Sequence, residues 1–234
     1  MRTRLASAVA IATAVAALGC EGRTSGFLTT GPTTGARVRL INALTSSQAI
    51  DFAVDGQVVS SGVPFGGASP YVSLSLASHQ LQARAAGTGT TLVNFTRDLT
   101  SEGTFSLVPA PGLAQAGALF LTDNPTPVTG QARIRVVHVA AVPGPVSIYF
   151  TTPTGEIGTA SPAVAALPFA TASDYVQLPP GTYRVRVTRA GNPSDVVADL
   201  GTLTVGGGSV RTLLVTDAPG GGLPTNLSVV ADAG

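Results

Sequence analysis

The sequence predicts an all-β protein made of two tandem antiparallel β-sandwich domains after a signal peptide. Three observations support this fold class. Apolar and polar residues alternate in short runs, turn-forming residues interrupt those runs at intervals of about 8–12 residues, and most of the pattern occurs twice. No segment after Gly19 has a sustained helical period with capping residues.

Length and composition exclude several classes of protein. The 234 residues suffice for two domains, and a 44% hydrophobic content is enough to build cores, so wholesale disorder is excluded. All thirteen basic residues are arginines, and twelve acidic residues nearly balance them, which argues against a nucleic-acid partner. The one cysteine cannot form an internal disulfide or a multi-cysteine zinc site. We expect no cofactor.

Residues 1–19 have the pattern of a signal peptide. Two arginines precede an uncharged apolar run that is shorter than the roughly 20 residues needed to cross a membrane. The run ends at Cys20, and the preceding Ala17-Leu18-Gly19 resembles the lipobox of bacterial lipoproteins. In this interpretation Cys20 is lipidated and the chain is exported and anchored in the cell envelope. Ordinary secretion, with cleavage near Ala17 or Gly19, is the alternative.

The residues after Cys20 extend this interpretation. Glu21 follows the cysteine, and by resemblance to the enterobacterial sorting rule this favours the outer membrane, if the cell has one. A secreted or periplasmic chain is the alternative. Gly, Thr and Ser dominate the stretch up to Gly35 without a hydrophobic period, so we interpret residues 20–35 as the lipidated cysteine and a flexible tether.

The rest of the chain contains one unit twice. Ala36–Arg39 returns as Ala132–Arg135, and Val63–Leu74 returns as Leu167–Leu178 with seven of twelve positions identical. A run that ends at Asp123 likewise has a counterpart that ends 109 residues later, at Asp232. These matches predict a first domain at 36–124, a linker at 125–130 and a second domain at 131–234.

Within each unit the pattern has a period of two. Ile50, Phe52 and Val54 share one face, with Asp51 and Asp55 on the other, and Asp55-Gly56 then predicts a tight hairpin turn. The segment 183–187 alternates in the same way. Because the chain has no Trp and few aromatic residues, we expect cores of small side chains.

These residues resemble the DUF4397 family, a domain of unknown function in secreted and cell-surface bacterial proteins. The resemblance is carried by both opening strands, by the acidic motif at 50–56, by the block at 64–74 and 168–178, and by Pro179–Val187 (PPGTYRVRV). It covers both predicted domains and implies two immunoglobulin-like or transthyretin-like sandwiches in an exported protein. It implies no activity.

Two histidines are candidates for chemistry. His138 stands where the first unit has Asn42, so we expect it to hydrogen-bond a loop carbonyl rather than to act as an acid or base. His79 corresponds to Tyr183, and we interpret it as drift in a turn. The chain has no Gly-x-Ser-x-Gly elbow, so a hydrolase would have to recruit one of these histidines and is the less favoured hypothesis. We predict no catalytic residues.

Charged residues give two further hypotheses. Asp51 and Asp55 are weak candidates for a Ca²⁺ site, and the alternative pairs them with Arg37 or Arg39 of a neighbouring strand. We favour the alternative and predict no metal. Arginine pairs on outward strand faces could bind an anionic cell-surface polymer or be simply solvated; they are 37/39, 133/135 and 184/186.

We therefore predict a non-enzymatic exported lipoprotein that acts as a binding or scaffold module of the cell envelope. Its expected partners are the membrane, through Cys20, and an envelope polysaccharide or a protein. A structural spacer or coat protein without a specific ligand is the alternative. The sequence does not indicate which residues bind the ligand.

Overall fold

The computed structural model describes residues 35–46, 48–113, 117–158 and 160–233. The predicted signal peptide, the lipidation site at Cys20 and the tether up to residue 34 lie outside the described residues. Within the described part, no helix is long and apolar enough to span a membrane.

The first eight strands form an N-terminal sandwich of two sheets, with strand orders β4-β1-β7-β8 and β3-β2-β5-β6. A core of Val, Leu, Ala, Ile and Phe side chains lies between the sheets. The strands are β1 (Ala36–Leu40), β2 (Ile50–Val54), β3 (Gln57–Val63), β4 (Val72–Leu74), β5 (Ser78–Ala85), β6 (Thr91–Asp98), β7 (Gly103–Pro109) and β8 (Ala118–Asp123).

The remaining strands form a C-terminal sandwich with the same arrangement. Its sheets have the orders β12-β9-β16-β17, with β13 also on β9, and β11-β10-β14-β15. Thus β9 takes the place of β1, β16 of β7 and β17 of β8. The strands are β9 (Ala132–Val139), β10 (Val146–Thr151), β11 (Val164–Leu167), β12 (Thr171–Ala172), β13 (Val176–Leu178), β14 (Gly181–Arg189), β15 (Val196–Val205), β16 (Val210–Thr216) and β17 (Asn226–Ala233).

The predicted all-β sandwich fold is confirmed, with one refinement. Each sandwich contains one parallel pair, β1 with β7 and β9 with β16, whereas the other strand pairs are antiparallel. A parallel pair needs a crossover connection, and here the chain passes through the opposite sheet between the two strands. Parallel strands are usually buried on both faces, which is the case here.

Local predictions hold at the first hairpin. Asp55 and Gly56 join β2 to β3 with φ angles of 48° and 84°, the left-handed conformation that a type I′ turn requires. Phe52 and Val54 are fully buried on β2, whereas Asp51 is only partly covered. The cores consist largely of Val, Leu, Ile and Ala, as the lack of Trp predicts.

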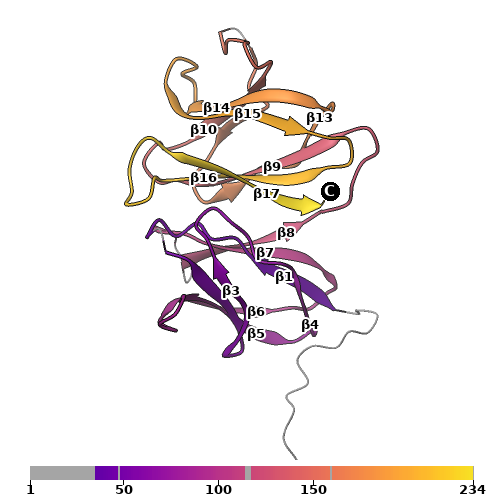
Figure 1. Ribbon diagram of the computed structural model, residues 1–234, viewed down its shortest axis with the longest axis vertical. Coiled ribbons are helices and arrows are strands. Elements are labelled where there is room, and N and C mark those ends of the chain that lie inside the picture. The colour runs from indigo at the N-terminus through magenta and orange to yellow at the C-terminus, as the bar shows by residue number, and fades with distance from the viewer. Residues whose placement is uncertain (1–34, 47, 114–116, 159, 234) are drawn as a thin grey trace, which may run out of the picture.

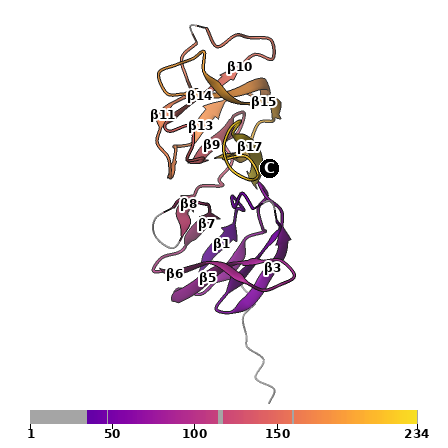
Figure 2. The same ribbon diagram turned by 90° about the vertical axis from the view of Figure 1, so that its left-hand side faces the viewer.

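The two sandwiches stack on each other through the sheets that contain β1 and β9 (Figures 1 and 2). A third apolar cluster lies at this junction and takes residues from both sides: Ile41, Ala43, Val108, Ala110, Val137, Val139, Leu214 and Val230. The strands at the junction are therefore covered on one face by their own core and on the other by the neighbouring sandwich.

This stacking corrects the prediction that the paired arginines are solvated. The second arginine of each pair is buried. Stacking buries Arg39 (1% exposed) and Arg135 (3% exposed). Arg186 (5% exposed) is instead covered by the end of β10 and the segment after it, where it donates to Thr151 and Gly155. The alternation of residues along the strands predicted that these side chains leave their own core, but it could not show what lies on the other side.

Candidate functional site

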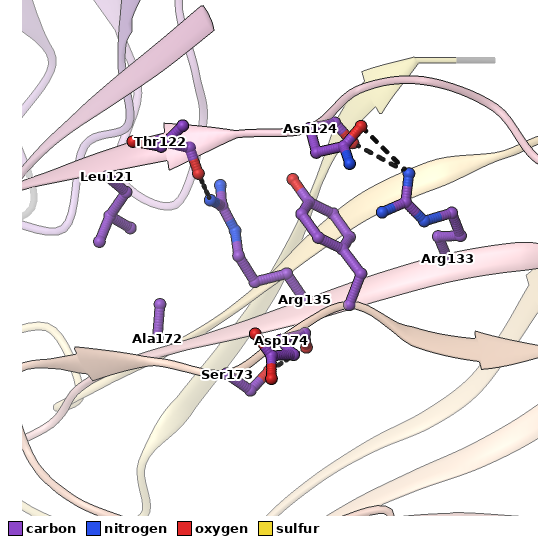
Figure 3. A pocket seen from close by; sticks show the side chains of 9 residues that line it. Leu121, Thr122, Asn124, Arg133, Arg135, Ala172, Ser173 and Asp174 are labelled. Carbon is purple, nitrogen blue, oxygen red and sulfur yellow. Dashed lines mark hydrogen bonds between the residues drawn. The ribbon is translucent and has the colours of Figure 1, made fainter.

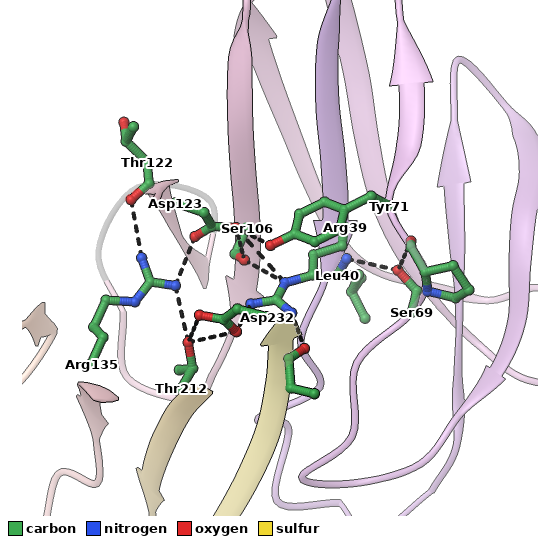
Figure 4. Close-up of polar contacts among 12 residues, drawn as sticks. Arg39, Leu40, Ser69, Tyr71, Ser106, Thr122, Asp123, Arg135, Thr212 and Asp232 are labelled. Atoms are coloured by element: carbon green, nitrogen blue, oxygen red, sulfur yellow. Dashed lines mark hydrogen bonds and ion pairs between the residues drawn. The ribbon is translucent and has the colours of Figure 1, made fainter. Parts of the chain in front are cut away.

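Two ion pairs cross the junction between the sandwiches (Figure 4). Arg39 of β1 donates to Asp232 of β17 at 2.5 Å, and Arg135 of β9 donates to Asp123 of β8 at 2.7 Å. Each pair joins an arginine of one sandwich to an aspartate of the other. All four side chains are at most 3% exposed, so these are buried ion pairs.

Each aspartate is also held by its own sandwich. Asp123 accepts hydrogen bonds from the hydroxyl of Ser106 at 2.6 Å and from that of Tyr71 at 2.7 Å. The equivalent hydroxyls bind Asp232 in the same way, from Thr212 at 2.9 Å and from Tyr175 at 3.0 Å. The junction therefore has an internal two-fold relation that reproduces the sequence repeat.

Both arginines also donate to main-chain carbonyls, although the Nε of Arg135 is buried without a hydrogen-bond partner among the described residues. Arg39 donates to the carbonyl of Ala231 at 2.9 Å and Arg135 to the carbonyl of Thr122 at 3.0 Å, again at equivalent positions. Each guanidinium also lies over a tyrosine ring, 4.7 Å from the centroid of Tyr71 for Arg39. Burying charges is costly unless they are paired and hydrogen-bonded, and this network meets that condition.

The two tyrosines act as hydrogen-bond donors to the aspartates. Burial raises the pKa of Tyr175 to about 12 and also raises the pKa of Tyr71 well above its ordinary value. Both phenols therefore remain protonated at neutral pH. Each can donate to its aspartate and leave that carboxylate to pair with the arginine of the other sandwich.

A cavity of about 430 Å³ opens at the edge of this junction (Figure 3). It is lined by residues 121, 122 and 124 at the end of β8, by Arg133 and Arg135 of β9, and by residues 172–175 between β12 and β13. Figure 3 shows Leu121 and Ala172 toward one end, with Asn124 and Arg133 toward the other. Its volume lies in the range of small-molecule sites.

Of these residues, the sequence singled out only Arg133 and Arg135, as one of three arginine pairs that could bind an anionic polymer or be solvated. Arg135 and Tyr175 recur as Arg39 and Tyr71 in the repeat, so their recurrence was the available signal. Asp174 and Asn124 do not recur, and only the fold brings them together.

The two candidate Ca²⁺ ligands have separate partners. Asp51 accepts a hydrogen bond from the N–H of Gly62 at 2.8 Å, and Asp55 accepts from the N–H of Gln80 at 2.8 Å and from His79. The favoured pairing with Arg37 or Arg39 is wrong, because β2 belongs to the opposite sheet from β1. Among the described residues, no group of three or more His, Cys, Asp or Glu side chains could hold a metal ion.

His79 lies in a triad-like arrangement that serves a structural role. Its Nδ1 is 2.7 Å from Asp55, and its Nε2 is 3.4 Å from the hydroxyl of Ser75. However, Nε2 is closer to the carbonyl oxygen of Ser75, at 3.0 Å, so it donates there and is not free to accept the proton of the hydroxyl. Burial opposes ionisation of Asp55, but hydrogen bonds from Gln80 and His79 outweigh burial and lower its pKa.

The equivalent tyrosine explains why a histidine stands at this position. Tyr183 donates to the carbonyl of Pro179, four residues earlier, as His79 does to Ser75. The interpretation of His79 as drift in a turn is therefore wrong. It lies in β5, is 5% exposed, and makes the same backward hydrogen bond as the tyrosine.

His138 occupies the position predicted for it. Nε2 lies 2.8 Å from the carbonyl oxygen of Gly144, six residues ahead, and Asn42 likewise donates to the carbonyl of Gln48, six residues ahead. The Nδ1 atom of His138 is buried without a hydrogen-bond partner. Burial lowers the pKa of His138, so the ring is neutral in the folded protein.

Residues 36–149 match the family model described as Domain of unknown function (DUF4397). This match supports the resemblance seen in the sequence; it spans the N-terminal sandwich and continues through β9 to Tyr149 in β10. No curated protein matches the chain.

Two solved structures are similar over most of their length. One is a CBM26-family domain of Eubacterium rectale Amy13K in complex with maltoheptaose, with 10% identity and a TM-score of 0.28, covering 82% of this chain and 95% of that chain. The other is a candidate adhesin from Bacteroides ovatus, with 9% identity and a TM-score of 0.22, covering 82% and 92%. These scores are too low to transfer a site, so the chemistry must come from the residues of this chain.

Removing one carboxylate from the junction tests the importance of the buried network. Asp232→Asn removes the closer of the two carboxylates at the buried Arg39 and leaves only Asp123, 3.8 Å from its Nε. We therefore expect the free energy of unfolding to fall by about 3 kcal/mol. Asp199→Asn is the matched control, because Asp199 pairs with Arg184 at the surface and such pairs contribute about 0–1 kcal/mol. Urea denaturation measures both values. Equal small losses would contradict the assigned role of the network.

The buried His138 makes stability sensitive to acid. The pKa of His138 is lower in the folded protein than in the unfolded chain. As pH falls through about 6.5, the unfolded chain therefore binds a proton that the folded protein does not bind. The free energy of unfolding consequently decreases from pH 7 toward pH 5. His138→Asn retains a donor, as Asn42 does, but cannot titrate. We expect its melting temperature to fall less than that of the wild type over this range. If the melting temperatures of the wild type and the variant fell equally between pH 7 and pH 5, His138 would not be the cause of the acid sensitivity.

Proposed function

We propose that this chain is an exported, lipid-anchored and non-enzymatic binding and scaffold module of the cell envelope, which takes its ligand in the junction cavity. The support for export and for lipidation at Cys20 is the signal-peptide pattern of residues 1–19 and the lipobox-like segment before the cysteine. The support for binding is the chemistry of the cavity.

The observation that carries the binding role is a pair of charged side chains at the cavity that the fold leaves available. Among the described residues, Arg133 makes no ion pair and the carboxylate of Asp174 makes no hydrogen bond, although both line the cavity. By contrast, Arg39 and Arg135 are each paired with an aspartate at the junction. Polar groups that converge on a concave site and keep unused donors or acceptors are typical of ligand recognition.

The scaffold role follows from the stacking of the two sandwiches. The ion pairs and the apolar cluster fix both walls of the cavity, since one wall comes from β8 of the N-terminal sandwich and the other from the C-terminal sandwich. A preformed site loses less entropy when it binds. Both histidines serve as hydrogen-bond donors within the structure, which supports a role without catalysis.

Co-sedimentation with isolated cell envelopes tests the binding role. We expect the purified protein to pellet with envelopes in a saturable manner and Arg133→Gln to pellet less, because the variant lacks the available cation. Arg37→Gln is the matched control, since Arg37 holds the equivalent position away from this cavity. Pelleting that does not saturate, or that is equal in both variants, would favour the spacer alternative.

Membrane fractionation tests the anchor. We expect the wild-type chain to partition into the membrane fraction and Cys20→Ser to lose its lipid and its membrane association. Metabolic labelling with a fatty-acid analogue gives an independent readout. A labelled Cys20→Ser chain, or an unlabelled wild type, would contradict lipidation at this residue.

A further inference from the structure

Hydrogen bonds within the described part of the chain hold the guanidinium of Arg133 in place, but they use only one of its three nitrogens. Its Nη1 donates to the carbonyl of Thr126 at 2.7 Å and to that of Asn124 at 3.2 Å, and its charge lies 4.6 Å from the ring centroid of Tyr175. Within the described residues, its Nε and Nη2 have no acceptor. One edge of a fixed guanidinium, with two parallel N–H donors, is therefore available to a ligand. This edge matches the geometry of a carboxylate.

An acceptor lies across the cavity from these donors. Asp174 is exposed, and Figure 3 places it opposite Asn124. An ionised carboxylate can only accept hydrogen bonds, so it suits the hydroxyl groups of a ligand. Leu121 and Ala172 provide an apolar surface at the other end of the cavity. The cavity thus combines a carboxylate-binding edge, a hydroxyl-binding group and an apolar surface.

The equivalent corner of the other sandwich provides an internal comparison. It retains the scaffold, because Arg37 lies 5.0 Å from the ring centroid of Tyr71, as Arg133 lies over Tyr175. The polar groups are replaced there, since Pro70 stands for Asp174 and Ala233 for Asn124. The junction therefore forms without a carboxylate or an amide at these positions. Folding does not explain the carboxylate of Asp174. By contrast, the Oδ1 of Asn124 accepts from the N–H of Thr126 and from Arg133.

We propose that the junction cavity binds a hexuronate unit of an anionic polysaccharide, that is, a sugar ring with one carboxylate. The carboxylate pairs with the Nε and Nη2 edge of Arg133, ring hydroxyls donate to Asp174, and the C–H face of the ring lies on Leu121. A phosphate dianion fits less well, because Asp174 repels two negative charges more strongly than the single charge of a carboxylate, and the charge of Arg135 is already balanced by Asp123. This inference rests on the proposed function and specifies its ligand.

Calorimetric titration with a galacturonate trimer tests this proposal, and the methyl ester of the same trimer is the matched probe. The ester retains the ring and its hydroxyls but has no negative charge. We expect the wild-type protein to bind the acid and to bind the ester roughly ten- to a hundredfold more weakly, as the loss of a hydrogen bond between charged groups predicts. Arg133→Gln should weaken binding of the acid to the same extent, and Arg37→Gln should leave it unchanged.

Several outcomes would overturn the inference, and the comparison of acid with ester needs no variant that could misfold. Equal binding of acid and ester would overturn carboxylate recognition while leaving the envelope-binding role in place. Displacement of the trimer by free alanine, which also carries a carboxylate and a donor, would overturn the assignment to a sugar. Failure of the acid to bind would overturn the hexuronate assignment, and if envelope pelleting is also absent, the proposed function fails with it.

Discussion

The crossed ion pairs at the junction are the interaction on which the rest of the structure depends. A single arginine buried beside an apolar cluster would be strongly destabilising. Here Arg39 and Arg135 each meet an aspartate that is already held by a serine or threonine and a tyrosine of the other sandwich. The network is complete only when both sandwiches are present and stacked, so these charges favour one relative orientation.

That orientation defines the cavity. Its walls come from both sandwiches, and Arg135 belongs to the ion-pair network and to the cavity lining at once. The duplication of the unit therefore has two consequences. The recurring residues form the junction, whereas Asp174 and Asn124, which differ between the copies, line the cavity at one corner.

The alternation of residues predicted the sandwich strands, the Asp55-Gly56 pair predicted its turn, and the equivalence of His138 to Asn42 predicted the carbonyl contact of His138. It could not distinguish Arg39 from Arg184, because both leave their own core and only the stacking of a second sandwich buries Arg39. The cavity was also beyond prediction, since its residues lie on segments that are far apart in the sequence. The recurrence of the same charged residues in both copies was the one signal of the junction within the sequence.

Calorimetric unfolding of the intact chain tests directly whether the crossed ion pairs make the two sandwiches one cooperative unit. The network predicts a single transition in the wild type, with equal calorimetric and van't Hoff enthalpies. It also predicts that the double variant Asp123→Ala with Asp232→Ala separates this transition into two. Two independent transitions in the wild type, or one unchanged transition in the double variant, would contradict the account.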